Sequence, residues 1–135
     1  MIFVLDNSVA MRWCFDEGHP YAAPILEKLE TGDTAVVPMM WLYEASAVLA
    51  QAQLRGIVTA QKADEFVEEL QSLSISTDPE SAARVFPDVH RLALAYRLTS
   101  YDAAYLEVAI RRGLPLATLD DDLVRASRAA GVTVL

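Results

Sequence analysis

Residues 99–123 join a helical pattern to a short apolar segment with almost no loop between them. Ser100 is a suitable N-cap for the helix, and the apolar residues after it recur at helical spacing. Gly113 and Pro115 end the helix, and residues 114–119 predict a short buried strand. A chain built from such units buries its strands by covering a sheet with helices.

This unit places two carboxylates at one edge of the fold. A helix of about 12 residues rises about 18 Å, and a strand of about 5 residues returns about 16 Å. Asp102, in the first helical turn, and Asp120, just after the strand, therefore lie at the same end of the domain. Each residue also has an ordinary structural explanation, because an Asp in a first turn complements the helix dipole and an Asp after a strand often caps the next helix.

The remainder of the chain continues the alternation of strands and helices. No linker divides it, and 135 residues suit one domain, so we expect residues 1–135 to form a single domain. The alternation predicts a three-layer α/β/α sandwich with a mainly parallel sheet. The expected strands are residues 2–5, 34–37, 73–76, 114–119 and 132–135. The expected helices are residues 8–15, 21–30, 38–55, 59–73, 79–99 with an interruption near Pro87, 101–112 and 121–130.

Two more carboxylates fall at positions where chemistry is expected. Asp6 directly follows the first strand, and the groups just past strand ends line the binding crevice of open α/β sheets. Glu44 is the only charged residue between positions 34 and 54, and an isolated buried carboxylate needs a partner, a metal or a raised pKa. Asp6 also suits a helix cap, and Glu44 also suits a helix edge that reaches water.

Four carboxylates without an accompanying His or Cys cluster favour a hard cation, Mg²⁺ or Mn²⁺. His19 and His90 are isolated and Cys14 is the only cysteine, which argues against a zinc site. A divalent ion relieves the repulsion among clustered carboxylates and activates water for attack on phosphorus, as phosphodiester hydrolysis requires. The set is Asp6, Glu44, Asp102 and Asp120, with Ser8 and Thr118 as supporting hydroxyls or as an ordinary helix start and strand residue.

The net charge of −8 argues against a general nucleic-acid binder, which carries a basic surface. A phosphodiester substrate remains compatible with it if metal ions neutralise the carboxylates and arginines gather locally. The single cysteine and a short apolar run at residues 1–5, too brief for a signal peptide or a membrane span, lead us to expect a cytoplasmic protein without membrane attachment. The candidates for a local basic patch, or for solvated helix faces, are Arg12, Arg97, Arg111, Arg112, Arg125 and Arg128.

Four segments, in order along the chain, carry a resemblance to a known family. Together they resemble PIN domains, and in particular the VapC-type toxins of bacterial and archaeal toxin–antitoxin modules. The resemblance covers almost the whole chain. The segments are residues 5–9 (Leu-Asp-Asn-Ser-Val) with Arg12 and Trp13, Pro38 with residues 41–44 (Trp-Leu-Tyr-Glu), residues 101–106 (Tyr-Asp-Ala-Ala-Tyr-Leu), and residues 117–120 (Ala-Thr-Leu-Asp) with Leu123.

The resemblance implies a Mg²⁺- or Mn²⁺-dependent endoribonuclease that cleaves RNA, is usually a homodimer and is inhibited by a small antitoxin. By match of motif, the four carboxylates take the family's acidic positions. Arg12 stands where many relatives have Lys, which keeps the charge but changes its geometry, and Ala47 stands where relatives often have Asn. The apolar helix at residues 39–54 supports a homodimer, and the acidic cleft suits a basic segment of the antitoxin.

Two alternatives stay open. A metal-dependent phosphatase of the haloacid-dehalogenase type also begins with a strand that ends in Asp, although Ser8 occupies the place of its usual second acid. A PIN fold that is catalytically silent and acts as a binding module is the second alternative, although the chain keeps all four acids. The sequence does not identify the RNA, since its tryptophans and tyrosines are equally explained as core residues.

Overall fold

A computed structural model describes all residues of the chain, 1–135. Its strands are β1 (Ile2–Leu5), β2 (Thr34–Val37), β3 (Ile75–Thr77) and β4 (Leu116–Ala117). They form one sheet in the order β3-β2-β1-β4, and every neighbouring pair is parallel. Phe3, Val4 and Leu5 of β1 are fully buried, as expected for a strand that is covered on both faces. The predicted parallel-sheet α/β fold is confirmed.

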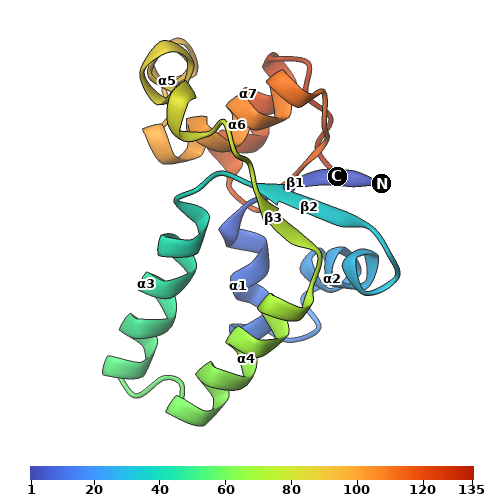
Figure 1. Ribbon diagram of the computed structural model, residues 1–135, viewed down its shortest axis with the longest axis vertical. Coiled ribbons are helices and arrows are strands. Elements are labelled where there is room, and N and C mark those ends of the chain that lie inside the picture. Colours follow the sequence, from blue (N-terminus) through green and yellow to red (C-terminus); the bar gives the residue numbers. More distant parts are fainter.

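Seven α-helices cover the two faces of this sheet, so the molecule has three layers (Figure 1). One face carries the first four helices and the other face carries the last three. Helix α6 packs on both β1 and β4. The first four helices are α1 (Asn7–Phe15), α2 (Ala22–Glu30), α3 (Trp41–Leu54) and α4 (Ala60–Ser72), and the last three are α5 (His90–Tyr96), α6 (Ser100–Arg112) and α7 (Asp121–Ala129).

The segment between β3 and α5 is an irregular helix. A 3₁₀ turn (Ala82–Arg84) leads into a π-helical turn (Val85–Val89) that contains Pro87. Proline lacks the N–H that a regular helix needs, so the predicted interruption is confirmed. None of the helices is both long and apolar enough to cross a lipid bilayer.

Several predicted element ends differ from the structure; for example, the helix expected over residues 79–99 is a regular α-helix only from His90 to Tyr96. Thr99, not Ser100, caps α6, because its hydroxyl accepts the backbone N–H of Asp102 at 3.1 Å. β4 has two residues rather than six, since the backbone N–H of Thr118 turns away to the hydroxyl of Tyr21. The expected strand at residues 132–135 is reduced to one bridge to β4, which is too short to support a longer ladder.

The parallel arrangement brings the ends of β1 and β4 together. Leu5 pairs with Ala117, and the next residue, Asp6, donates its backbone N–H to the Ala117 carbonyl at 3.0 Å. The residues that follow both strands therefore share one edge of the sheet, where binding sites of open parallel sheets form.

Candidate active site

Four different elements contribute the carboxylates predicted from the sequence. Asp6 lies between β1 and α1, Asp120 lies between β4 and α7, and Glu44 and Asp102 lie in the first turns of α3 and α6. Burial is the largest cause of the raised pKa of Asp102, and the charges of the other three carboxylates add to it. The structure thus gathers all four residues into one acidic cluster at the carboxyl edge of the sheet.

Asp6 is the most firmly held member of the cluster. Its side chain is 5% exposed, and its Oδ2 atom accepts hydrogen bonds from Ser8 Oγ and Thr118 Oγ1, both at 2.7 Å. Burial raises the pKa of Asp6, and the charge of Asp120 raises it further. The two hydroxyls lower this pKa and offset part of the cost of burying a carboxylate. Ser8 and Thr118 therefore lie where the sequence led us to expect supporting hydroxyls.

Glu44 is held by Tyr105, a residue whose sequence pattern is that of a core position. The hydroxyl of Tyr105, a fully buried residue of α6, donates a hydrogen bond to Glu44 Oε1 at 2.5 Å. Burial, followed by the charge of Asp6, raises the pKa of Glu44, whereas the Tyr105 hydroxyl lowers it. The only signal for this role was spacing, because Tyr105 follows Asp102 by three residues and shares its face of the helix.

Asp120 belongs to the acidic cluster and also caps a helix, and Asp102 belongs to the same cluster. Asp120 Oδ1 accepts the backbone N–H of Leu123 at 2.9 Å and so caps α7, as one of the structural explanations predicted. Its own N–H donates to Thr118 Oγ1 at 3.0 Å. Asp102 is half-buried, and burial together with Asp120 and Asp6 raises its pKa from 3.8 to about 6.

The donor set of the cluster fits a hard divalent cation in its chemistry. All four side chains offer carboxylate oxygens, and none of them pairs with Lys, Arg or the N-terminus. The buried Oδ1 atom of Asn7, beside Asp6, also lacks a hydrogen-bond donor. However, no three His, Cys, Asp or Glu side chains in the structure are arranged so that they could hold a metal ion together.

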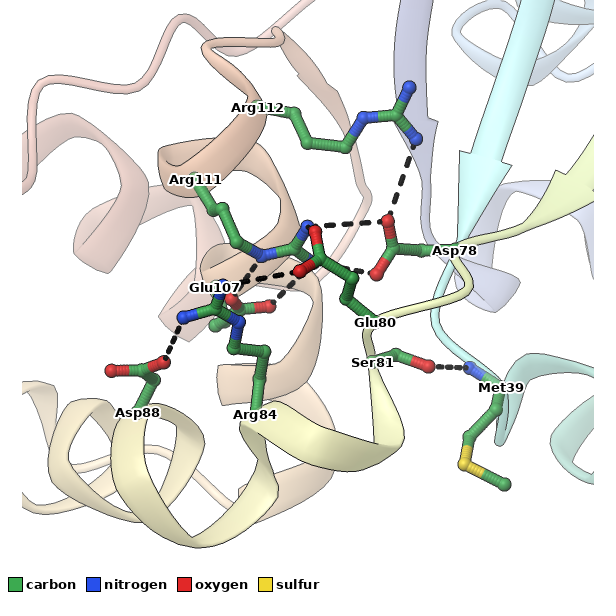
Figure 2. Close-up of polar contacts among 9 residues, drawn as sticks. All are labelled: Met39, Asp78, Glu80, Ser81, Arg84, Asp88, Glu107, Arg111 and Arg112. Carbon is green, nitrogen blue, oxygen red and sulfur yellow. Dashed lines mark hydrogen bonds and ion pairs between the residues drawn. The ribbon is translucent and has the colours of Figure 1, made fainter.

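Two of the candidate arginines are committed to ion pairs outside the acidic cluster (Figure 2). Arg111 binds the buried carboxylates of Asp78 at 2.6 Å and Glu107 at 2.7 Å, as well as Glu80 at 3.0 Å. Glu107 and then Asp78 raise its pKa even further above the ordinary arginine value. Arg112 lies 3.6 Å from Asp78. Arg111 is therefore not free to bind a phosphate, contrary to its place among the candidates, whereas Arg112 is engaged only by this one longer contact.

The remaining predicted positions lie on the surface. Arg12 is exposed on α1, and its side chain forms no hydrogen bond or ion pair within the chain. Ala47 is exposed on α3, where it lines a shallow cavity of about 510 Å³ together with Phe15, Val48 and Ile57. The Arg12 side chain forms no hydrogen bond or ion pair with the four carboxylates, and Ala47 lies one helical turn after Glu44 on α3.

Comparisons with known proteins agree with this architecture. Three solved structures share the fold, although identities below 25% support the fold alone. VapBC2 from Rickettsia felis, solved bound to a DNA fragment from its promoter, has a TM-score of 0.71 and 12% identity and covers 100% of this chain and 98% of its own. PAE2754 from Pyrobaculum aerophilum has a TM-score of 0.68, 24% identity and coverage of 93% and 79%. FitAcB from Neisseria gonorrhoeae has a TM-score of 0.65, 19% identity and coverage of 100% and 96%.

Sequence comparison gives the family. Ribonuclease VapC3 from Pyrobaculum aerophilum is 36% identical over 81 residues. The match spans 60% of this chain and 62% of that relative, so it covers less than two thirds of the relative's length. The model of the PIN domain family matches residues 3–129, which include all four carboxylates of the cluster. The chain therefore belongs to the PIN domain family.

Proposed function

We propose that residues 1–135 form a single nuclease domain that cleaves RNA with Mg²⁺ or Mn²⁺ and serves as the toxin of a toxin–antitoxin pair. The observation that carries the proposal is the acidic cluster, whose four carboxylates lie at one sheet edge without any cationic partner. The similarity to a relative named a ribonuclease supports RNA as the substrate. Family membership gives no support to the phosphatase alternative.

Each residue of the cluster has a defined part in the proposed reaction. Asp6, fixed by two hydroxyls, and Glu44, fixed by Tyr105, are the pre-oriented ligands, and Asp102 and Asp120 complete the set. When bound, a divalent ion supplies positive charge that neutralises the cluster and activates water for attack on the phosphodiester. The raised pKa of Asp102 reflects burial and the charges of its neighbours, which a bound cation would offset.

The carboxylate donors favour a hard cation such as Mg²⁺ or Mn²⁺. Mg²⁺ usually keeps several water ligands and binds proteins through one or two carboxylates together with substrate phosphates. Because no three of these side chains are arranged to hold an ion by themselves, that mode suits the cluster better than an all-protein cage. We propose that the substrate phosphate completes the ligand set.

Exposed apolar surface supports the proposed homodimer and antitoxin. Leu54, at the end of α3, is 85% exposed, and Leu42 and Tyr43 on the same helix are also exposed. A cavity of about 490 Å³ between α3, α4 and β3 is lined mainly by apolar residues, including Trp41 and Leu70. We propose that the antitoxin packs on this exposed apolar surface and extends a basic side chain to the acidic cluster. That side chain would compete with the metal for the carboxylates.

Purified protein tests the nuclease proposal directly. RNA and p-nitrophenyl phosphate are incubated with the wild type, Asp102→Asn and the exposed control Asp64→Asn, with Mn²⁺ or with EDTA. We expect the wild type and Asp64→Asn to cleave RNA only with Mn²⁺, and Asp102→Asn to be inactive with an unchanged circular-dichroism spectrum. Hydrolysis of the small ester alone would support the phosphatase alternative, and a folded wild type that cleaves neither would support the silent binding module.

A further inference from the structure

We infer that Tyr105 is a positioning residue that orients Glu44 for the divalent ion, an inference that rests on the proposed metal-dependent function. The Tyr105 hydroxyl donates to Glu44 Oε1 at 2.5 Å and accepts the backbone N–H of Asn7 at 3.4 Å. One phenol oxygen therefore joins the start of α1, the first turn of α3 and the middle of α6. Each of these elements also carries or adjoins one carboxylate of the cluster.

The two hydrogen bonds give the hydroxyl a defined direction. A phenol has one proton, and the N–H of Asn7 already occupies one lone pair of its oxygen. The single hydroxyl proton therefore points to Glu44 Oε1. No other side chain in the structure donates a hydrogen bond to Glu44. Glu44 Oε2 is left without a protein partner and is the oxygen that remains for a ligand.

A neutral donor suits this position better than a cation. Lys or Arg at position 105 would form an ion pair with Glu44 and would compete with the metal for its negative charge. The phenol fixes the orientation of the carboxylate and leaves its charge in place. Ser8 and Thr118 act on Asp6 in the same way, so two carboxylates of the cluster are both held by uncharged hydroxyls.

Loss of the hydroxyl should weaken metal binding while the fold persists. Glu44 would lose the contact that restricts its side-chain rotamers. Metal binding would then have to order this side chain, at a cost in conformational entropy. Outer hydrogen-bond partners of metal ligands typically contribute about 10- to 100-fold to metal affinity. We therefore expect Tyr105→Phe to bind Mn²⁺ about tenfold more weakly than the wild type.

Mn²⁺ titration by calorimetry, without RNA, tests the inference. The proteins compared are the wild type, Tyr105→Phe, Glu44→Gln and the double variant, with Tyr96→Phe as the control. Tyr96 is partly buried in α5, and its hydroxyl makes no hydrogen bond within the chain. Guanidinium unfolding of each protein shows whether the fold is retained.

The expected result is weaker Mn²⁺ binding by Tyr105→Phe, wild-type binding by Tyr96→Phe, and no added loss when Tyr105→Phe is combined with Glu44→Gln. Wild-type affinity in Tyr105→Phe would overturn the inference and leave the nuclease proposal intact. An equal further loss in the Glu44→Gln background would also overturn it, because Tyr105 would then act through something other than Glu44. A folded wild type that binds no Mn²⁺ would overturn the metal-dependent function and the inference with it.

A second measurement uses the wild-type protein, so it does not depend on whether a Tyr105 variant folds. The buried hydroxyl proton, hydrogen-bonded to a carboxylate, should give a downfield NMR signal that is assigned through contacts to its ring. We expect Mg²⁺ to shift this signal as Glu44 binds the ion. A signal that Mg²⁺ leaves unmoved, while it shifts the resonances of residues around Asp6, would overturn the role of Tyr105.

Discussion

Replacement of Asp102 by Asn should stabilise the metal-free protein at pH 7.5 and change its stability little at pH 4. Burial, with Asp120 and Asp6 adding to it, raises the folded-state pKa of Asp102 from 3.8 to about 6. An acid with a raised pKa favours folding only while it is protonated. The stability it contributes is present below pH 3.8 and is lost as the pH rises through about 6. Asn cannot ionise, so the variant escapes this loss.

The size of the effect follows from the two pKa values. Each pH unit between the folded and unfolded pKa corresponds to about 1.4 kcal/mol, which gives about 3 kcal/mol for a fully buried group. Asp102 is only half-buried, and solvent screening reduces the interaction of partly exposed charges, so we expect about 1.5 kcal/mol. For a chain of this size, that corresponds to a rise in Tm of about 5 °C.

Guanidinium unfolding followed by circular dichroism at both pH values, in EDTA, measures the effect. Asp64→Asn is the matched control, because it removes the same charge from an exposed position on α4. Excess Mn²⁺ should then narrow or reverse the difference at pH 7.5, since the ion stabilises the wild-type cluster more. An equal gain at pH 4 and pH 7.5, or the same gain in Asp64→Asn, would refute the reasoning.

Three further predictions concern the rest of the molecule. Arg111→Ala should lower the unfolding free energy by about 3 kcal/mol, because it leaves Glu107 buried without its partner and Asp78 with only the more distant Arg112. The exposed Arg128→Ala should change the unfolding free energy little, and equal effects in denaturant melts would contradict this. Sedimentation velocity at micromolar concentration should show a homodimer that buries apolar surface of α3, and a monomer would count against it. Neutralising the antitoxin's cleft-reaching basic residue should restore RNA cleavage in the complex, while full inhibition would place the blocking contact elsewhere.

The placement of Asp6 and Asp120 was predictable because chain direction alone determines it. Parallel strands end at one edge, and short apolar runs mark where β1 and β4 stop. Periodicity likewise located the helix that carries Asp102. The exact strand lengths were less accessible, since the turn at Thr118 depends on the hydroxyl of Tyr21, which lies 97 positions away in the sequence.

Long-range polar partners were beyond the reach of local pattern. Tyr105 lies at helical spacing among apolar residues and so matches a core position, while Glu44, its partner, is 61 positions away. Arg111 was a candidate for a basic patch or a solvated helix face, and neither interpretation indicated that Asp78 and Glu80 would bind it. Tyr105 and Arg111 each had an adequate local explanation, and no nearby residue pointed to their long-range partners.

Because Asp120 caps α7, the start of this helix should respond to changes of charge in the acidic cluster. Asp120 shares one carboxylate between Leu123 N–H and any ligand of the cluster, so a change of charge there acts on the hydrogen bond at 2.9 Å. Leu123 is fully buried, and its amide exchanges with solvent only when the start of α7 opens. In a ¹⁵N-edited NMR spectrum, this single amide should therefore report occupancy of the cluster by a cation or a basic side chain, without RNA and without any attached label.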